Sequence, residues 1–257
     1  MLKVTGLGVN YRGLEAVRDV SFHLQAGQWL MLAGPNGAGK SSLLQAVAQT
    51  VPATGSILVG GDEARRLPAR TLARRLAVLR QTHSLGYAFT VEQLVSLGRY
   101  AHQGAFSRGD PQGRQKVEEA LALCGLDQIR KQNALTLSGG ELQRAFLAQV
   151  FAQDAPLLLL DEPASHLDLA YQQSIFGLIA LWLRTPGRAV MSVVHDLQLA
   201  RRYGSHVLLM REGRSLAWGP IDQALTDHHL QEAYGLDVRA WFTWLQDPWV
   251  DGQNPPN

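Results

Sequence analysis

The sequence has one cysteine, a small net charge and no long apolar run. The single Cys124 excludes internal disulfides and any zinc site built from cysteines alone. The net charge of +2 is too small to indicate a surface for nucleic acid, so we expect no nucleic-acid partner. No stretch approaches the ~18 apolar residues that a membrane-spanning helix needs, and the N-terminus lacks the apolar core of a signal peptide. We therefore expect a protein of the cytosol.

The sequence does contain an alternation of apolar strands and helices. The composition of buried strands is found in WLMLAG, PLLLLDEP and AVMSVVHD, and that of helices in SSLLQAVAQ and LAYQQSIFGLIALWL. This alternation predicts a mainly parallel sheet in an α/β fold. Helix signals dominate between about residues 82 and 153, where Thr90 can cap one helix and Asp110 can open another. We expect one domain over residues 1–246, with this helical segment inserted into it, and a disordered tail over 247–257.

The segment GPNGAGKS matches the pattern G-x-x-x-x-G-K-[ST] and lies between a predicted strand and a predicted helix. Gly34, Gly37 and Gly39 allow the backbone to curl, so that consecutive N–H groups point at phosphate oxygens. Lys40 can reach the β- and γ-phosphates, and the hydroxyl of Ser41 can hold Mg²⁺. The residues predicted to bind the phosphates are Gly34, Pro35, Asn36, Gly37, Ala38, Gly39, Lys40, Ser41 and Ser42.

Three other predicted strands end in side chains suited to nucleotide hydrolysis. Asp161 ends LLLLD and can bind Mg²⁺ through water, and Glu162 comes next and can polarise a water aimed at the γ-phosphate. His195 follows another apolar strand, which favours a contact with the γ-phosphate over a purely structural role. Gln81 ends LAVLRQ and can touch Mg²⁺ or the attacking water. We expect catalysis to use Glu162, His195 and Gln81, and the metal to be held by Ser41, Gln81 and Asp161, because parallel strands present ligands at their carboxyl ends.

A second phosphate-shaped segment, TLSGGELQR, lies about a hundred residues after the first. Ser138, Gly139 and Gly140 offer a hydroxyl and N–H groups at the start of a predicted helix, an arrangement that also binds phosphate. Taken alone, the segment is equally well explained as an ordinary helix cap. The residues by themselves do not say why one chain needs two such loops.

The order and spacing of these motifs resemble those of the ATP-binding subunits of ABC transporters over nearly the whole chain. In that family GPNGAGKS is similar to the Walker A motif, LLLLDEP to Walker B and LSGGE to the signature motif. Gln81 stands at the position of the Q-loop, His195 at that of the switch histidine and Asp168 in the D-loop. Tyr11 stands where the family places an aromatic ring that stacks on adenine. The resemblance implies a P-loop NTPase core with a small antiparallel β part and an inserted helical subdomain, which hydrolyses ATP with Mg²⁺.

The resemblance also implies a use for the second loop. In this family two subunits pack head to tail, and each ATP lies between Walker A of one subunit and the signature of the other. Two residues depart from the usual motifs, since Glu141 replaces a commoner Gln and His166 replaces a commoner Ala in the D-loop. Neither departure touches an essential role, so we expect an active ATPase. The residues expected to act on the partner's nucleotide are Leu137, Ser138, Gly139, Gly140 and Glu141.

Three further segments, SLGYAFTVEQLVSLGRYAH, HLDLAYQ and VVHDLQLARRYGSHVLLM, resemble those of importers for iron–siderophore, haem and vitamin B12. The resemblance implies a homodimer at the cytoplasmic face of the bacterial inner membrane, bound to multispanning permease subunits and served indirectly by an extracytoplasmic substrate-binding protein. Tyr87, Phe89 and Val91 are expected to form an apolar set on which the permease docks. Importers of molybdate, zinc or manganese are close alternatives, and a non-transport ABC ATPase is a more distant one.

Overall fold

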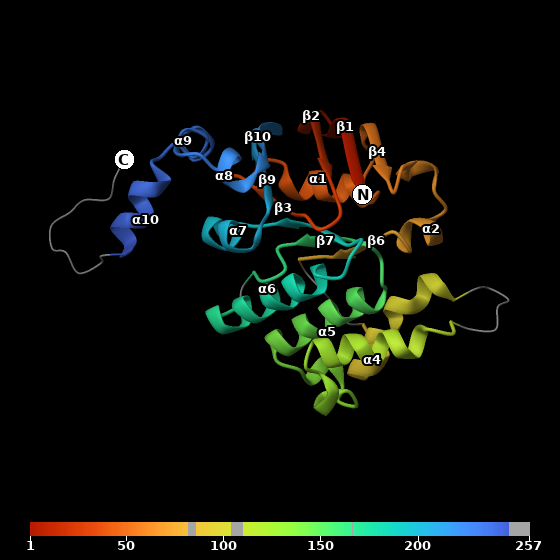
Figure 1. The fold of residues 1–257 in the computed structure, drawn as a ribbon. Helices are drawn as coiled ribbons and strands as arrows, with labels where there is room; N and C mark the ends of the chain where they lie inside the picture. The colour runs from red at the N-terminus through yellow and green to blue at the C-terminus, as the bar shows by residue number, and fades with distance from the viewer. Residues whose placement is uncertain (82–85, 104–109, 166, 247–257) are drawn as a thin grey trace.

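The computed structural model describes residues 1–81, 86–103, 110–165 and 167–246. The predicted tail at 247–257 and His166 lie outside the described residues. Figure 1 shows an antiparallel sheet, a central sheet and a group of helices as successive layers, with helix α1 (Lys40–Val47) between the two sheets.

The described strands form two sheets. The antiparallel sheet has the order β2-β1-β4-β5. Its strands are β1 (Leu2–Tyr11), β2 (Leu14–Leu24), β4 (Thr54–Val59) and β5 (Asp62–Glu63). The central sheet has the order β10-β9-β3-β8-β7-β6, and its neighbours are parallel except for β9 and β10. Its strands are β3 (Trp29–Ala33), β6 (Leu76–Leu79), β7 (Leu157–Asp161), β8 (Ala189–Val193), β9 (His206–Arg211) and β10 (Arg214–Pro220).

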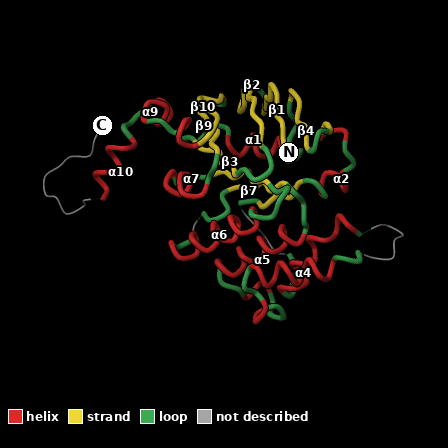
Figure 2. The backbone as a smooth tube through the Cα atoms, in the orientation of Figure 1, coloured by secondary structure: helices red, strands yellow, loops and turns green. Residues whose placement is uncertain are grey.

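Helices cover both faces of the central sheet, as Figure 2 shows by colour. The helices of the core, besides α1, are α2 (Ala69–Ala73), α6 (Leu169–Leu183), α7 (Leu197–Tyr203), α8 (Ile221–Ala224), α9 (Asp227–Tyr234) and α10 (Val238–Gln246). The helical group contains α3 (Val91–Ser96), α4 (Gly113–Leu123) and α5 (Gly139–Ala152). None of these described helices has both the length and the apolar composition needed to cross a membrane.

Strand β3 shows why the central sheet is buried on both faces. All five of its residues are buried, and so are all five of β7 and of β8. Trp29 and Met31 belong to the apolar cluster that faces the helical group, whereas Leu30 and Leu32 belong to the cluster that faces the antiparallel sheet. Successive side chains of a strand point to opposite faces, so one apolar strand contributes to two cores.

Of the two helix starts predicted in the helical group, the structure confirms the one at Thr90 and not the one at Asp110. Thr90 caps α3 with a capping box, in which its hydroxyl accepts from the backbone of Gln93 and the Gln93 side chain accepts from the backbone of Thr90. Helix α4 begins at Gly113, so the prediction that Asp110 opens it is wrong. The carboxylate of Asp110 instead accepts a hydrogen bond from the Nε of Arg99 at 2.7 Å, in a buried ion pair.

Candidate active site

Four neighbouring parallel strands, in the order β3-β8-β7-β6, end at the same edge of the central sheet. The phosphate-binding loop follows β3 and leads into α1 at Lys40. His195 lies two residues after β8, Glu162 directly after β7 and Gln81 two residues after β6. The strand order therefore places Glu162 between His195 and Gln81, which lie far from it in the sequence.

The phosphate-binding loop is held in a shape that only glycine permits. Gly39 has a φ of 95° and caps α1, and a Cβ there would lie 2.2 Å from the carbonyl oxygen of Ala16. The ammonium of Lys40 donates to the carbonyl oxygens of Gly34 at 2.7 Å and of Pro35 at 2.9 Å. Burial lowers the pKa of Lys40, although the carboxylates of Glu162 and Asp161 oppose this. The cation is thus fixed across the loop whose N–H groups bind phosphate.

Ser41 and Asp161 meet beside this loop. The Ser41 hydroxyl donates to Oδ1 of Asp161 at 3.3 Å, and burial raises the pKa of the Asp161 carboxyl. A hydroxyl and a carboxylate are oxygen ligands of the kind that Mg²⁺ prefers, so this pair fits the ion. Among the described residues no group of three or more His, Cys, Asp or Glu side chains could hold a metal. An ion at this pair can take its other ligands from water, from nucleotide phosphates and from an amide oxygen such as that of Gln81.

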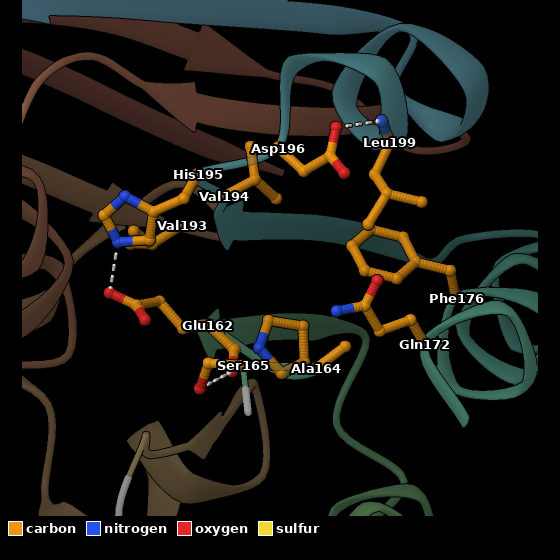
Figure 3. Close-up of a pocket in the computed structure, with 11 residues that line it drawn as sticks. Glu162, Ala164, Ser165, Gln172, Phe176, Val193, Val194, His195, Asp196 and Leu199 are labelled. Atoms are coloured by element: carbon orange, nitrogen blue, oxygen red, sulfur yellow. Dashed lines mark hydrogen bonds and ion pairs between the residues drawn. The ribbon is translucent and has the colours of Figure 1, made fainter. Parts of the chain in front are cut away.

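The carboxylate of Glu162 is held on both sides. Nε2 of His195 lies 2.6 Å from its Oε1, and Nε2 of Gln81 donates to its Oε2 at 2.7 Å. An ionised carboxylate only accepts hydrogen bonds, so Nε2 of His195 is the donor. Figure 3 shows Glu162 and His195 pointing toward one another across the mouth of a small pocket. Glu162 also has a φ of 50°, a left-handed backbone conformation that is costly for a side chain of this size and is typical of functional sites.

A cleft of about 610 Å³ runs from Glu162 and His195 along the phosphate-binding loop, a volume typical of small-molecule sites. Tyr11, the residue predicted to stack on adenine, is among the residues that line it. Its hydroxyl donates to Oε1 of Gln45 at 3.4 Å. The cleft thus brings Tyr11, residues 36–42 of the loop, Glu162 and His195 into one site, whereas Gln81 and Asp161 are not among the residues that line it.

The cleft also contains residues that sequence reasoning missed. Leu14, Ala16 and Arg18 reach it from β2, and Glu212 and Gly213 reach it from the turn between β9 and β10. Leu14 is 67% exposed, a property that the structure shows and the sequence does not. No motif marks the others, because the pairing of distant strands brings them to the cleft. The backbone N–H of Arg18, for example, donates to the carbonyl of Gly213 at 2.7 Å.

The predicted signature residues lie apart from this cleft. Ser138 is the N-cap of α5 and forms a capping box with Glu141, whose carboxylate accepts from both the backbone N–H and the hydroxyl of Ser138. The hydrogen bond from the Ser138 hydroxyl lowers the pKa of the Glu141 carboxyl. None of residues 137–141 is among the described residues that line the nucleotide-sized cleft. The two phosphate-shaped loops of one chain therefore do not form one site.

The predicted D-loop residue Asp168 caps another helix. Its carboxylate accepts from the backbone N–H of Tyr171 at 2.9 Å and so caps α6. The carbonyl oxygen of Glu162 accepts from the Ser165 hydroxyl at 3.1 Å, which turns the chain away from β7. The segment after Glu162 is thus shaped by local hydrogen bonds at both ends.

Comparison with known proteins decides the family. The family model described as ABC transporter matches residues 17–165, more than half of the 257 residues. The chain belongs to the ABC transporter family. The hemin import ATP-binding protein of Pseudomonas entomophila is 41% identical over 244 residues, which cover 93% of this chain and 94% of that protein. The ferric enterobactin transport ATP-binding protein of Escherichia coli is 33% identical, over 90% of this chain and 85% of that protein.

The likeness extends to a solved structure of the ABC transporter family. A metal-chelate type ABC transporter in an inward-facing conformation has a TM-score of 0.79 at 26% identity, covering 92% of this chain and 89% of that chain. These findings confirm the family, the P-loop NTPase fold class and the ATPase activity that the motifs predict. The protein is an ABC-type ATPase that binds and hydrolyses ATP.

Proposed function

We propose that this ATPase powers a bacterial importer of an iron chelate, haem or vitamin B12. The similarity to ATP-binding proteins named for hemin import and ferric enterobactin transport supports the first two cargo classes. The cargo itself does not reach this chain, which contributes only the hydrolysis of ATP. An importer of this kind requires ATPase subunits at the cytoplasmic face of the membrane, multispanning permease subunits and an extracytoplasmic binding protein.

The observation that carries the catalytic part of the proposal is the Glu162 carboxylate held between Gln81 and His195. Glu162 orients and polarises the attacking water, and His195 contacts the γ-phosphate and fixes the carboxylate. Lys40 and the N–H groups of the loop stabilise the charge that develops on the phosphates. Ser41 and Asp161 would hold Mg²⁺, and Gln81 would join them once its side chain turns from Glu162. The bound ion would neutralise phosphate charge during hydrolysis.

The dimeric part of the proposal follows from the separation of the two phosphate-shaped loops. Because residues 137–141 do not line the chain's own cleft within the described structure, the N–H groups of Gly139 and Gly140 can face a nucleotide on another copy, and the Ser138 hydroxyl can join them once it turns from the carboxylate of Glu141. Two copies packed head to tail complete two sites, each with the cleft of one copy and the signature of the other. The site needs both copies, so the working form is a homodimer.

A covalently joined pair of subunits tests this arrangement. One subunit carries Lys40→Ala, the other carries Ser138→Arg, and both carry Glu162→Gln to slow hydrolysis. If the signature acts on the partner's nucleotide, one site contains both damaged parts and the other is intact, so one ATP is trapped per pair. If each chain uses its own signature, both sites are damaged and none is trapped.

The matched control places Lys40→Ala and Ser138→Arg in the same subunit of the pair. In a head-to-tail dimer each shared site then contains one damaged part, so no ATP should be trapped. If each chain used its own signature, the unaltered subunit should trap one ATP. Trapping by the control and not by the first pair would overturn the proposed dimer.

The permease is proposed to dock on the helical group beside Gln81. Tyr87 is 76% exposed, and its ring lies 6.2 Å from that of Phe89, which is half-buried against the apolar core. Val91 is completely buried in the core, so the expectation that it joins this docking set is wrong. Leu97 is a further exposed apolar side chain of the same group. Replacing Tyr87 with Glu is expected to weaken co-purification with the permease subunits while ATP binding by the isolated chain is unchanged.

The cargo class is tested in proteoliposomes that contain the chain, its permease subunits and the substrate-binding protein. ATP-driven uptake is measured for a ferric siderophore, haem, cobalamin, molybdate and zinc under the same conditions. Uptake of one of the first three, lost with Glu162→Gln, is the expected result. Uptake of molybdate or zinc alone would overturn the proposed cargo and leave the ATPase assignment intact.

A further inference from the structure

The first turn of α5 packs on an aromatic ring from the first turn of α6. Gly140 is buried, and a Cβ built on it would lie 2.4 Å from Cδ1 and Cε1 of Tyr171. No side chain fits between this backbone and the ring without a rearrangement. Gly140 therefore has a packing role in the isolated chain, in addition to any contact that its N–H group makes with phosphate.

Arg144 lies one turn further along α5 and contacts the same ring. Its guanidinium carbon is 5.8 Å from the centre of the Tyr171 ring, within the range of a cation–π interaction. The Nε of Arg144 is buried and has no hydrogen-bond partner within the described structure. The ring of the half-buried Tyr171 thus contacts both the backbone of Gly140 and the side chain of Arg144.

Tyr171 is itself fixed to the D-loop. Its backbone N–H donates to Oδ1 of Asp168 at 2.9 Å, the hydrogen bond that caps α6. Tyr171 therefore contacts Asp168 through its backbone and the first turn of α5 through its ring. That turn contains the signature residues that the proposed dimer presents to the partner's ATP.

A second contact joins α5 to the catalytic segment. The Nε2 of Gln143 donates to the carbonyl oxygen of Pro163 at 2.7 Å, and Pro163 directly follows Glu162. Gln143 and Tyr171 thus link the same helix to two points of the chain, one beside the catalytic carboxylate and one at Asp168. Gln143 is half-buried and Pro163 is buried, so solvent does not readily replace their hydrogen bond, whereas Asp168 is exposed.

We infer that Tyr171 and Gln143 are positioning residues that join the signature of one chain to that chain's own catalytic segment. In the proposed dimer the signature and Glu162 of one chain serve different ATP molecules. The two contacts therefore transmit the state of one ATP site to the other through a single chain. The inference rests on the proposed head-to-tail dimer, and its test separates the two.

The test measures the ATP concentration for half-maximal dimer formation, by size-exclusion chromatography, in the Glu162→Gln background. Gly140→Ala is expected to raise this concentration by about tenfold or more, since its Cβ displaces the Tyr171 ring. Adding Tyr171→Ala to Gly140→Ala removes the obstructing ring and should restore at least part of the loss. If Gly140 serves only the approach of phosphate, the double variant will be no better than Gly140→Ala.

Two further variants keep the test decisive if Gly140→Ala fails to fold. Tyr171→Phe retains the ring and should behave like its parent, whereas Tyr171→Ala should raise the ATP concentration several-fold. Gln143→Leu loses its donor to Pro163 and should also raise the ATP concentration several-fold. The control is Gln115→Leu on the surface of α4, where the amide donates to Glu119, and it should behave like the parent. ATP binding to the monomeric chain should be unchanged in all of these, because the cleft lies elsewhere.

The outcomes distinguish the inference from the proposed dimer. A Glu162→Gln parent that forms no ATP-dependent dimer contradicts the proposed function. If the parent dimerises, and Tyr171→Ala and Gln143→Leu need the same ATP concentration for half-maximal dimer formation, the result contradicts the inference and leaves the proposed dimer intact.

Discussion

His195 and Glu162 lie 33 positions apart in the sequence, yet Nε2 of the imidazole is 2.6 Å from Oε1 of the carboxylate. The contact exists because β7 and β8 are adjacent parallel strands, so the residues that follow them emerge side by side. Gln81 completes the arrangement from β6 on the other side of β7. The two hydrogen bonds orient the carboxylate, and a preoriented group limits the reorganisation needed for catalysis.

Glu162→Gln is expected to slow ATP hydrolysis by roughly 100-fold or more while ATP still binds, since a catalytic base is removed and the cleft is kept. The measurement is steady-state phosphate release together with nucleotide affinity of the purified chain. Asp222→Asn, at an exposed side chain of α8, is the control and should hydrolyse ATP like the parent. Near-normal turnover in Glu162→Gln would assign the base to another residue.

Gln81→Glu is expected to reduce turnover more than Gln81→Ala does. The amide of Gln81 donates to Glu162, so a carboxylate in its place would repel the base and raise the pKa of one member of the pair. The alanine variant removes only the donor. The pH dependence of kcat distinguishes the two, because the glutamate variant should regain activity toward higher pH as both carboxyls ionise. Equal activity of both variants over the whole pH range would exclude this contact from catalysis.

Asp161→Asn is expected to stabilise the nucleotide-free protein at neutral pH. Burial raises the pKa of Asp161 in the folded state, so folding favours the protonated carboxyl and the ionised form destabilises the fold. The stability gained by the variant should be largest above the folded-state pKa and should shrink as the pH falls through it. Urea unfolding from pH 7.5 downward, without Mg²⁺ or ATP, measures the effect.

The same Asp161→Asn variant should lose the additional stability that Mg²⁺ together with ATP gives to the parent. Asp127→Asn, in the short turn Asp127–Ile129, is the matched control and should keep that gain. A nucleotide-free Asp161→Asn protein that is less stable than its parent at pH 7.5 would contradict the prediction.

Arg99→Leu is expected to reduce the free energy of unfolding by about 3–5 kcal/mol, because it leaves the carboxylate of Asp110 buried without its partner. Arg99 also donates to the carbonyl of Ala152 at 2.8 Å, at the C-terminal end of α5 where a cation is favourable. The double variant Arg99→Leu/Asp110→Leu should lose less than Arg99→Leu alone, since no charge is left buried. Urea unfolding at pH 7 measures both, and a double variant that is the less stable of the two would refute the explanation.

Several functional features were determined by residues close together in the sequence. The glycines and Lys40 of the phosphate-binding loop, the acidic pair after LLLL and the capping box of Ser138 with Glu141 each depend on spacings of a few residues. Their backbone geometry is set locally, so the pattern predicts it before any fold is known. The alternation of strands and helices likewise predicted the parallel sheet and, with the family resemblance, the ABC ATPase.

Tertiary structure alone decided which of these residues meet. The order β3-β8-β7-β6 places His195 and Gln81 on opposite sides of Glu162, and no spacing along the chain specifies that order. The tertiary structure also buries Val91, which was predicted from the sequence to be a docking residue, and it pairs the side chain of Asp110 with Arg99. The packing of Tyr171 on Gly140 belongs to the same class, because two helices about thirty residues apart must come together to create it. Contacts of this kind depend on the packing of distant elements, whereas the motifs depend only on the conformation of a short stretch of backbone.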